Sequence, residues 1–88
     1  KGELFGFVKD GRKLLIANID DTIHATDLIC THADADLSTG FLSEEGVRCP
    51  LHLSVFNLVN GKPNNLPAET ALNVYPVKID NNEIFVEV

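Results

Sequence analysis

Two short cysteine–histidine groups constrain this chain more than any other feature of its sequence. The first is Cys-Thr-His at positions 30–32, and the second is Cys-Pro-Leu-His at positions 49–52, with sixteen residues between them. Each group offers one thiolate and one imidazole. Two such groups that face each other supply two sulfur and two nitrogen ligands, a set that suits zinc or an iron–sulfur centre. The fold must therefore bring two separate loops together.

A lone cysteine or histidine is usually a buried small side chain or a surface residue. Here, however, the two groups use both cysteines and two of the three histidines in the chain. We therefore predict that Cys30, His32, Cys49 and His52 bind a metal centre. The third histidine, His24, lies in an alternating segment without a partner motif. We predict that it is structural or exposed.

Short apolar runs, followed by one segment of alternating apolar and polar residues at 22–27, predict β-strands in the first third of the chain. Strands are expected over residues 3–9, 13–19 and 22–27, and the turn signals Asp10-Gly11 and Asp20-Asp21 separate them. No segment carries the apolar stripe of a long helix. The three segments are spaced like a β-meander.

The last part of the chain also alternates and predicts a β-hairpin. One strand is expected over residues 72–79 and another over 83–88, with a turn at Asp80-Asn81-Asn82. Pro76 falls within the first of these strands. Because proline has no N–H to donate, we expect it at an edge or a bulge.

The region between residues 30 and 68 is rich in Gly, Pro, Asn, Ser and Asp, and we predict that it is largely irregular. It contains every candidate ligand, and long irregular regions in small folds usually carry function. With 88 residues, the chain is expected to form a single domain, residues 1–88, with a cluster-binding part at about 29–58 inserted in a β base. A domain of this size has a marginal core, so a bound metal would stabilise it.

The composition excludes several classes of protein. The net charge of −6, from 13 acidic and 7 basic residues, argues against nucleic-acid binding and fits a basic protein partner. No apolar run approaches the roughly 20 residues needed to span a bilayer. Residues 1–10 show no signal-peptide pattern, so the cytoplasm is the expected compartment.

The mixed Cys/His pairs match Rieske centres, in which two histidines replace two cysteines on one of two irons. The run CTHADADLSTGFLSEEGVRCPLHLSVF, residues 30–56, resembles the Rieske motif, and the tail from residue 66 is similar to the end of small Rieske ferredoxins. This resemblance implies an all-β Rieske fold. Its parts would be an antiparallel β-sandwich base, a small cluster-binding subdomain of two loops, and one [2Fe–2S] cluster per chain.

The resemblance also implies roles for individual residues. Cys30 and Cys49 would bind one iron, and His32 and His52 would bind the other, near the protein surface. Four further residues fall at family positions around the cluster. The hydroxyl of Ser54 could donate toward a bridging sulfide, and Phe56 stands where respiratory members have a tyrosine. Pro67 would belong to the loop that covers the cluster, and Leu51 is next to a ligand.

The function implied by the resemblance is that of a one-electron carrier, not an enzyme. A ferredoxin reductase would supply electrons, and the oxygenase of a bacterial ring-hydroxylating dioxygenase system would receive them. We expect a monomer. The alternatives are a Rieske subunit of another redox complex, a zinc-stapled interaction module, and a metal-free domain with a Cys30–Cys49 disulfide. A further alternative is the Rieske domain of a larger oxygenase or oxidase. Such an enzyme typically needs a catalytic iron held by two histidines and a carboxylate, and only His24 remains for such a site in this chain, which argues against catalysis here.

Overall fold

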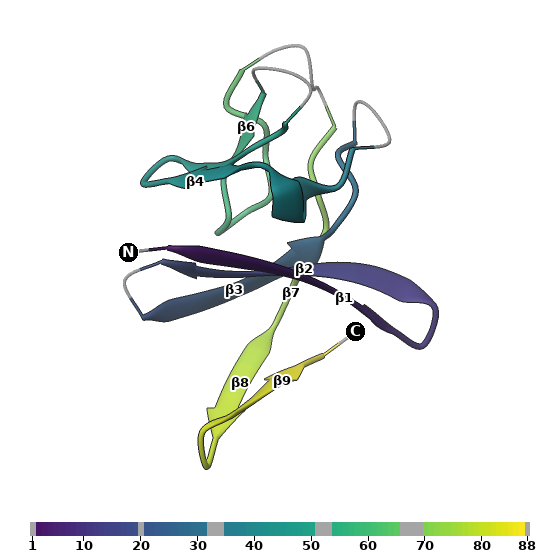
Figure 1. Cartoon of the computed structure of the whole chain (residues 1–88), viewed down its shortest axis with the longest axis vertical. Helices are drawn as coiled ribbons and strands as arrows, with labels where there is room; N and C mark the ends of the chain where they lie inside the picture. Colours follow the sequence, from purple (N-terminus) through teal and green to yellow (C-terminus); the bar gives the residue numbers. More distant parts are fainter. Residues whose placement is uncertain (1, 20, 32–34, 51–53, 66–69, 88) are drawn as a thin grey trace.

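An antiparallel sheet built mainly from the N-terminal third forms the middle layer of the molecule (Figure 1). The computed structural model describes residues 2–19, 21–31, 35–50, 54–65 and 70–87. The sheet has the order β1-β2-β3-β7, and we call it the base sheet. Its strands are β1 (Glu3–Lys9), β2 (Arg12–Ile19), β3 (Thr22–Asp27) and β7 (Val74–Tyr75). The three predicted N-terminal strands are confirmed, and β2 begins one residue earlier than expected.

Two tight turns have the left-handed backbone that favours hairpins. Asp10 and Gly11 join β1 to β2 with φ values of 52° and 80°. Asn81 and Asn82 have φ values of 52° and 66° and join the two strands of the C-terminal hairpin. Asn, Asp and Gly tolerate this region better than other residues, and such turns match the twist of paired strands. Both turn predictions are therefore confirmed.

The central strand β2 is buried on both faces. Leu14 and Ile16 point to one side and belong to one buried cluster, whereas Leu15 and Ala17 point to the other side and belong to a second. None of the four is more than 7% exposed. Because both faces are covered, β2 reads as a continuous apolar run rather than as an alternating strand. The base sheet thus separates two small cores.

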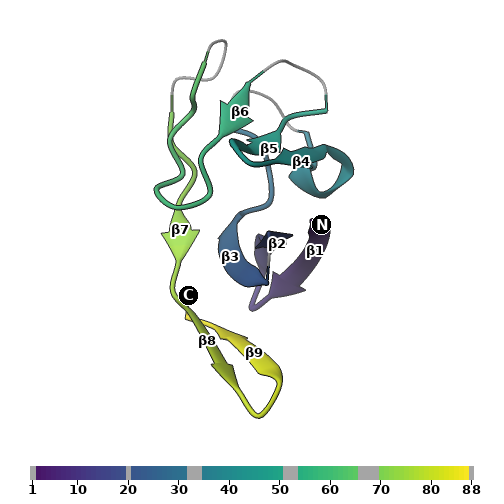
Figure 2. The ribbon, with the colours of Figure 1, turned by 90° about the vertical axis from the view of Figure 1, so that its left-hand side faces the viewer.

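The C-terminal hairpin covers one of these faces. It consists of β8 (Val77–Asp80) and β9 (Glu83–Val86), which pair only with each other among the described strands. Val86 is buried with Leu14 and Ile16, and Val77 packs against the same cluster. Figure 2 shows this hairpin at one end of the molecule, away from β4, β5 and β6.

The prediction of one strand over residues 72–79 is wrong in one respect, because Pro76 divides it. β7 before the proline joins the base sheet, whereas β8 after it joins the C-terminal hairpin. Pro76 has no N–H for a ladder, but its carbonyl accepts a hydrogen bond from the Glu87 N–H at 3.0 Å. The proline therefore marks the point where the chain changes sheets.

A small second sheet covers the other face of the base sheet. It has the order β4-β5-β6, with β4 (Phe41–Ser43), β5 (Gly46–Arg48) and β6 (Val55–Phe56), and a short 3-10 helix, η1 (Leu37–Thr39), precedes it. The Asp36 carboxylate caps this helix by accepting from the Ser38 N–H at 2.8 Å. Residues 30–68 are thus less irregular than predicted, because strands of two or three residues are too short to show alternation.

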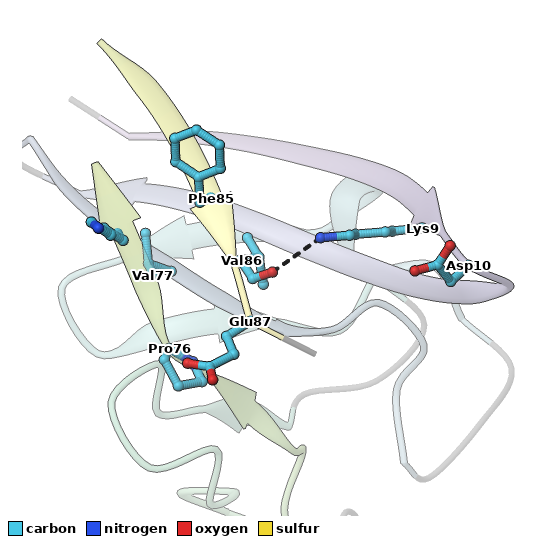
Figure 3. Close-up of a pocket in the computed structure, with 8 residues that line it drawn as sticks. Lys9, Asp10, Pro76, Val77, Phe85, Val86 and Glu87 are labelled. Atoms are coloured by element: carbon cyan, nitrogen blue, oxygen red, sulfur yellow. Dashed lines mark hydrogen bonds between the residues drawn. The ribbon is translucent and has the colours of Figure 1, made fainter. Parts of the chain in front are cut away.

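A groove of about 540 Å³ opens between the β1–β2 turn and the C-terminal hairpin (Figure 3). The Lys9 ammonium donates to the Val86 carbonyl at 3.3 Å across it. Neither Cys30 nor Cys49, the two predicted ligands that the structure describes, lines this groove. The part of the chain that the structure describes contains no helix with the length and apolarity needed to cross a bilayer.

Tyr75 on β7 donates a hydrogen bond of 2.5 Å to the carboxylate of Asp27 on β3. This bond, then burial, then the negative charge of Asp27, raise the pKa of Tyr75 above its usual value of 10.0, and Arg12 opposes the shift. The folded state therefore holds the proton more tightly than the unfolded state does. The resulting stabilisation is fully present below about pH 10 and is lost as the pH rises through the folded-state pKa.

We expect the phenolate absorbance of Tyr75, the sole tyrosine in the chain, to titrate above pH 10.0 in the folded protein. The substitution Asp27→Asn should lower that midpoint, because it removes the charge and weakens the acceptor. The exposed acid Glu83, changed to Gln, is the control. A folded-state midpoint equal to that in denaturant would contradict the prediction.

Candidate metal centre

The first cysteine opens a short loop directly after the base sheet. Leu28 follows β3, and its N–H donates to the Lys13 carbonyl at 3.1 Å, which keeps the chain against β2. Ile29 then forms an antiparallel bridge with Asp36. Within that bridge, the Cys30 N–H donates to the Ala35 carbonyl at 2.9 Å. Residues 30–35 are called the first ligand loop.

The second cysteine opens a loop of the same construction. Arg48 at the end of β5 pairs with Val55 at the start of β6. Within that pair, the Cys49 N–H donates to the Ser54 carbonyl at 3.0 Å. Residues 49–54 are called the second ligand loop. In both loops a bridge between residues seven apart encloses a bond from a cysteine N–H to the carbonyl five residues later.

Both cysteines are buried in the same apolar core. Cys30 is 4% exposed and Cys49 is 1% exposed, and the fully buried Phe56 belongs to the same cluster. The two cysteines are not joined by a disulfide. This arrangement does not match the metal-free alternative with a Cys30–Cys49 disulfide. Burial in a shared core keeps both thiol groups away from bulk water.

Gly46 allows β5 and β6 to approach each other closely beneath the second ligand loop. Its φ of 138° is rarely adopted by other residues, and a Cβ at this position would clash with the carbonyl oxygen of Phe56. The glycine therefore has a steric reason to be at this position. It helps to fix the strand pair from which Cys49 and Ser54 extend.

The structure describes some of the predicted site residues and not others. Cys30, Cys49, Ser54 and Phe56 are all buried, and the two cysteines and Phe56 share one core cluster. The other four predicted residues lie outside the described residues: His32, Leu51, His52 and Pro67. Within the described ranges no group of three or more His, Cys, Asp or Glu side chains could hold a metal ion.

His24 is half-buried on β3, where it is paired with Ala17 of β2. It lines cavities formed with Leu58 and Val59, and it does not lie in either ligand loop. This half-buried place in the base sheet is compatible with the predicted structural role of His24. Sequence reasoning missed Asn65, whose side-chain oxygen accepts from the Val55 N–H at 2.9 Å, next to the second ligand loop.

The residues present fit a centre with mixed sulfur and nitrogen ligands. Each ligand loop begins with a buried cysteine, and each contains one histidine in its sequence, at position 32 or 52. The sequence of the two loops thus offers two thiolates and two imidazoles, one of each from each loop. Thiolate and imidazole together suit an iron–sulfur centre, as in sites where two histidines replace two cysteines on one iron.

Comparison with known proteins gives the same class of site. Residues 1–76 match the Rieske [2Fe-2S] domain. The ferredoxin component of the naphthalene 1,2-dioxygenase system of Pseudomonas putida is 33% identical over 87 residues, covering 99% of this chain and 84% of that protein. The ferredoxin component of biphenyl 2,3-dioxygenase from Rhodococcus jostii (strain RHA1) is 34% identical over 86 residues, covering 98% and 80%.

A solved structure has the same fold over nearly the full length. It is the complex of reduced oxygenase and oxidized ferredoxin in carbazole 1,9a-dioxygenase, and the matching chain has a TM-score of 0.93 and 31% identity. The match covers 98% of this chain and 89% of that chain. The predicted all-β Rieske fold is confirmed.

Fold and ligand loops thus define an iron–sulfur protein of the Rieske class. The chain belongs to the Rieske [2Fe–2S] domain family. It is an electron-transfer protein and not an enzyme, and its cofactor is one [2Fe–2S] cluster. The family match favours this cluster over the zinc-stapled alternative.

Phe56 should be more important for stability than the exposed aromatic residue of the same small sheet. We expect Phe56→Leu to lower the free energy of unfolding by about 1–2 kcal/mol, because it leaves a gap in the core beside both cysteines. Phe41→Leu is the matched control, since Phe41 is 66% exposed on β4. Urea denaturation measures the free energy of unfolding of both variants. Equal losses for the two variants would refute the assignment of Phe56 to the supporting core.

Proposed function

We propose that this chain accepts electrons one at a time from a ferredoxin reductase and delivers them to the oxygenase of a ring-hydroxylating dioxygenase system. The observation that carries the proposal is the pair of equivalent loops, each beginning with a buried cysteine. The carbazole 1,9a-dioxygenase structure, which contains an oxygenase and a ferredoxin in complex, supports the choice of acceptor. The choice of a ferredoxin reductase as the electron donor rests on the resemblance to Rieske ferredoxins.

The proposed ligands of the cluster are Cys30 and Cys49 on one iron and His32 and His52 on the other. With two thiolates and two neutral imidazoles, the oxidised cluster is close to neutral, so it accepts one electron more readily than a cluster with four thiolates. The proposed neighbours of the cluster are Leu51, Ser54, Phe56 and Pro67. The chain's contribution is to hold the ligands at a fixed separation.

The described residues support this role physically. The buried thiol groups lie in a core that excludes water, and the loop-closing hydrogen bonds of Cys30 and Cys49 restrict their movement. Hydrogen bonding and burial around the sulfur ligands are among the factors that set the potential of such centres. The net charge of −6 favours association with a basic partner surface. The proposal includes a cytoplasmic monomer with one domain, residues 1–88.

We expect the purified protein to be red-brown and to contain iron and acid-labile sulfide in equal amounts. After reduction with dithionite, its electron paramagnetic resonance spectrum should show the low average g-value of a mixed Cys/His [2Fe–2S] centre. His32→Ala and His52→Ala should each abolish the spectrum, because each removes a ligand. His24→Ala is the control and should retain it. A colourless or zinc-containing protein, produced with ample iron, would overturn the proposed function.

We expect the reduced protein to transfer electrons to the purified oxygenase of the Pseudomonas putida naphthalene 1,2-dioxygenase system, and stopped-flow absorbance measures the rate. If the acidic chain meets a basic surface, the second-order rate should fall as the Debye length shrinks from about 30 Å at 0.01 M salt to about 8 Å at 0.15 M. No transfer, or a rate that rises with salt, would contradict this prediction.

A further inference from the structure

Two stretches of chain that lie outside the ligand loops form hydrogen bonds with residues in or beside these loops. Asn64 and Asn65 bind Val55, which directly follows the second ligand loop: the Asn64 N–H donates to the Val55 carbonyl at 2.7 Å, and the Val55 N–H donates to the Asn65 side-chain oxygen at 2.9 Å. Val55 is only 4% exposed, so its N–H depends on an acceptor within the protein. We call Asn64 and Asn65 the second-loop anchor.

The first ligand loop is held in a comparable way. The Thr31 hydroxyl, one residue after Cys30, donates to the Thr70 carbonyl at 2.6 Å. Three residues before Cys30, the Asp27 carboxylate accepts from the Asn73 N–H at 3.0 Å, and the Asp27 N–H donates to the Asn73 carbonyl at 3.1 Å. Thr31 and Asp27, which bond to Thr70 and Asn73, thus lie on either side of Cys30 in the sequence. We call Thr70 and Asn73 the first-loop anchor.

A short covalent connection joins the two anchors. Asn65 and Thr70 are separated by only four residues in the sequence, so their Cα atoms can be no more than roughly 18 Å apart, whatever path the chain takes. Each anchor is bonded to a different ligand loop. The connection therefore limits how far the two loops can move apart.

We propose that Asn65 and Thr31 are positioning residues of the redox centre, which fasten the two ligand loops to one short piece of chain and so keep the four ligands at the separation that one cluster requires. This inference rests on the ligand set given under the proposed function. Neither side chain is among the proposed ligands. Their effect on the cluster is transmitted through Val55 and Thr70.

The first test compares the rates at which variants of the holoprotein lose their cluster to excess chelator, followed by visible absorbance. Asn65→Leu and Thr31→Val each remove one anchoring bond and should accelerate the loss by about tenfold, the size expected from one unsatisfied buried amide or lost hydrogen bond. Asn60→Leu is the matched control. Its side-chain oxygen also accepts from a backbone N–H, that of Lys62 at 2.9 Å, but it binds neither ligand loop. It should stay within about twofold of wild type.

Conservative rescue and spectroscopy separate positioning from general weakening. Asn65→Asp keeps an acceptor for the Val55 N–H and should restore slow loss of the cluster. The g-values of the reduced protein should shift in Asn65→Leu and remain at wild-type values in Asn60→Leu. Each substitution loosens one end of the same connection, while the Asn64–Val55 and Asp27–Asn73 bonds remain, so the effects of Asn65→Leu and Thr31→Val should be less than additive in the double variant.

If Asn65→Leu does not yield folded protein, Thr31→Val and its g-values decide in its place. Wild-type rates and g-values in these variants, equal acceleration in Asn60→Leu, or additive effects in the double variant would each overturn the positioning role. A wild-type protein without a cluster would instead overturn the proposed function, so the two failures are distinguishable.

Discussion

The hydrogen bond that closes each ligand loop is the interaction on which the rest of the structure depends. The Cys30 N–H binds the Ala35 carbonyl, and the Cys49 N–H binds the Ser54 carbonyl. A cluster held by four side chains from two distant parts of the chain needs both parts to be ordered at once. These bonds fix the start of each loop, and the bridges Ile29–Asp36 and Arg48–Val55 support them from below. The strands around them make those bridges possible.

The base sheet gives this small chain two cores instead of one. Because β2 is buried on both faces, one core can pack under the ligand loops while the other packs under the C-terminal hairpin. The first core contains both cysteines, so metal binding at these proposed ligands would stabilise the same part of the molecule as core packing does. Binding energy of this kind contributes to folding energy when the ligands converge only in the native state. An 88-residue chain gains more from such coupling than a larger one would.

An electron carrier needs no substrate pocket, and the groove described here lies away from the cysteines, between the β1–β2 turn and the C-terminal hairpin. Its chemistry instead depends on keeping ligand geometry nearly unchanged between two redox states. Polar side chains that touch backbone groups near the ligand loops, such as Thr31 and Asn65, serve that purpose. Each of these hydrogen bonds contributes little to stability, but each acts next to a ligand loop, where movement would change the ligand geometry most.

The sequence by itself determined the family, the β pattern and the turns, because these depend on local signals. The Cys/His spacing, the alternation of residues 22–27 and the turns at Asp10-Gly11 and Asn81-Asn82 all act over a few residues. Only the tertiary structure decided that Pro76 divides two strands between two sheets, that the short strands β4 to β6 form, and that Asp27 bonds Asn73. The Asp27–Asn73 contact joins residues 46 positions apart, and the β4-β5-β6 strands are too short to have a period of their own. Such features arise when distant segments pack together, and no local pattern records them.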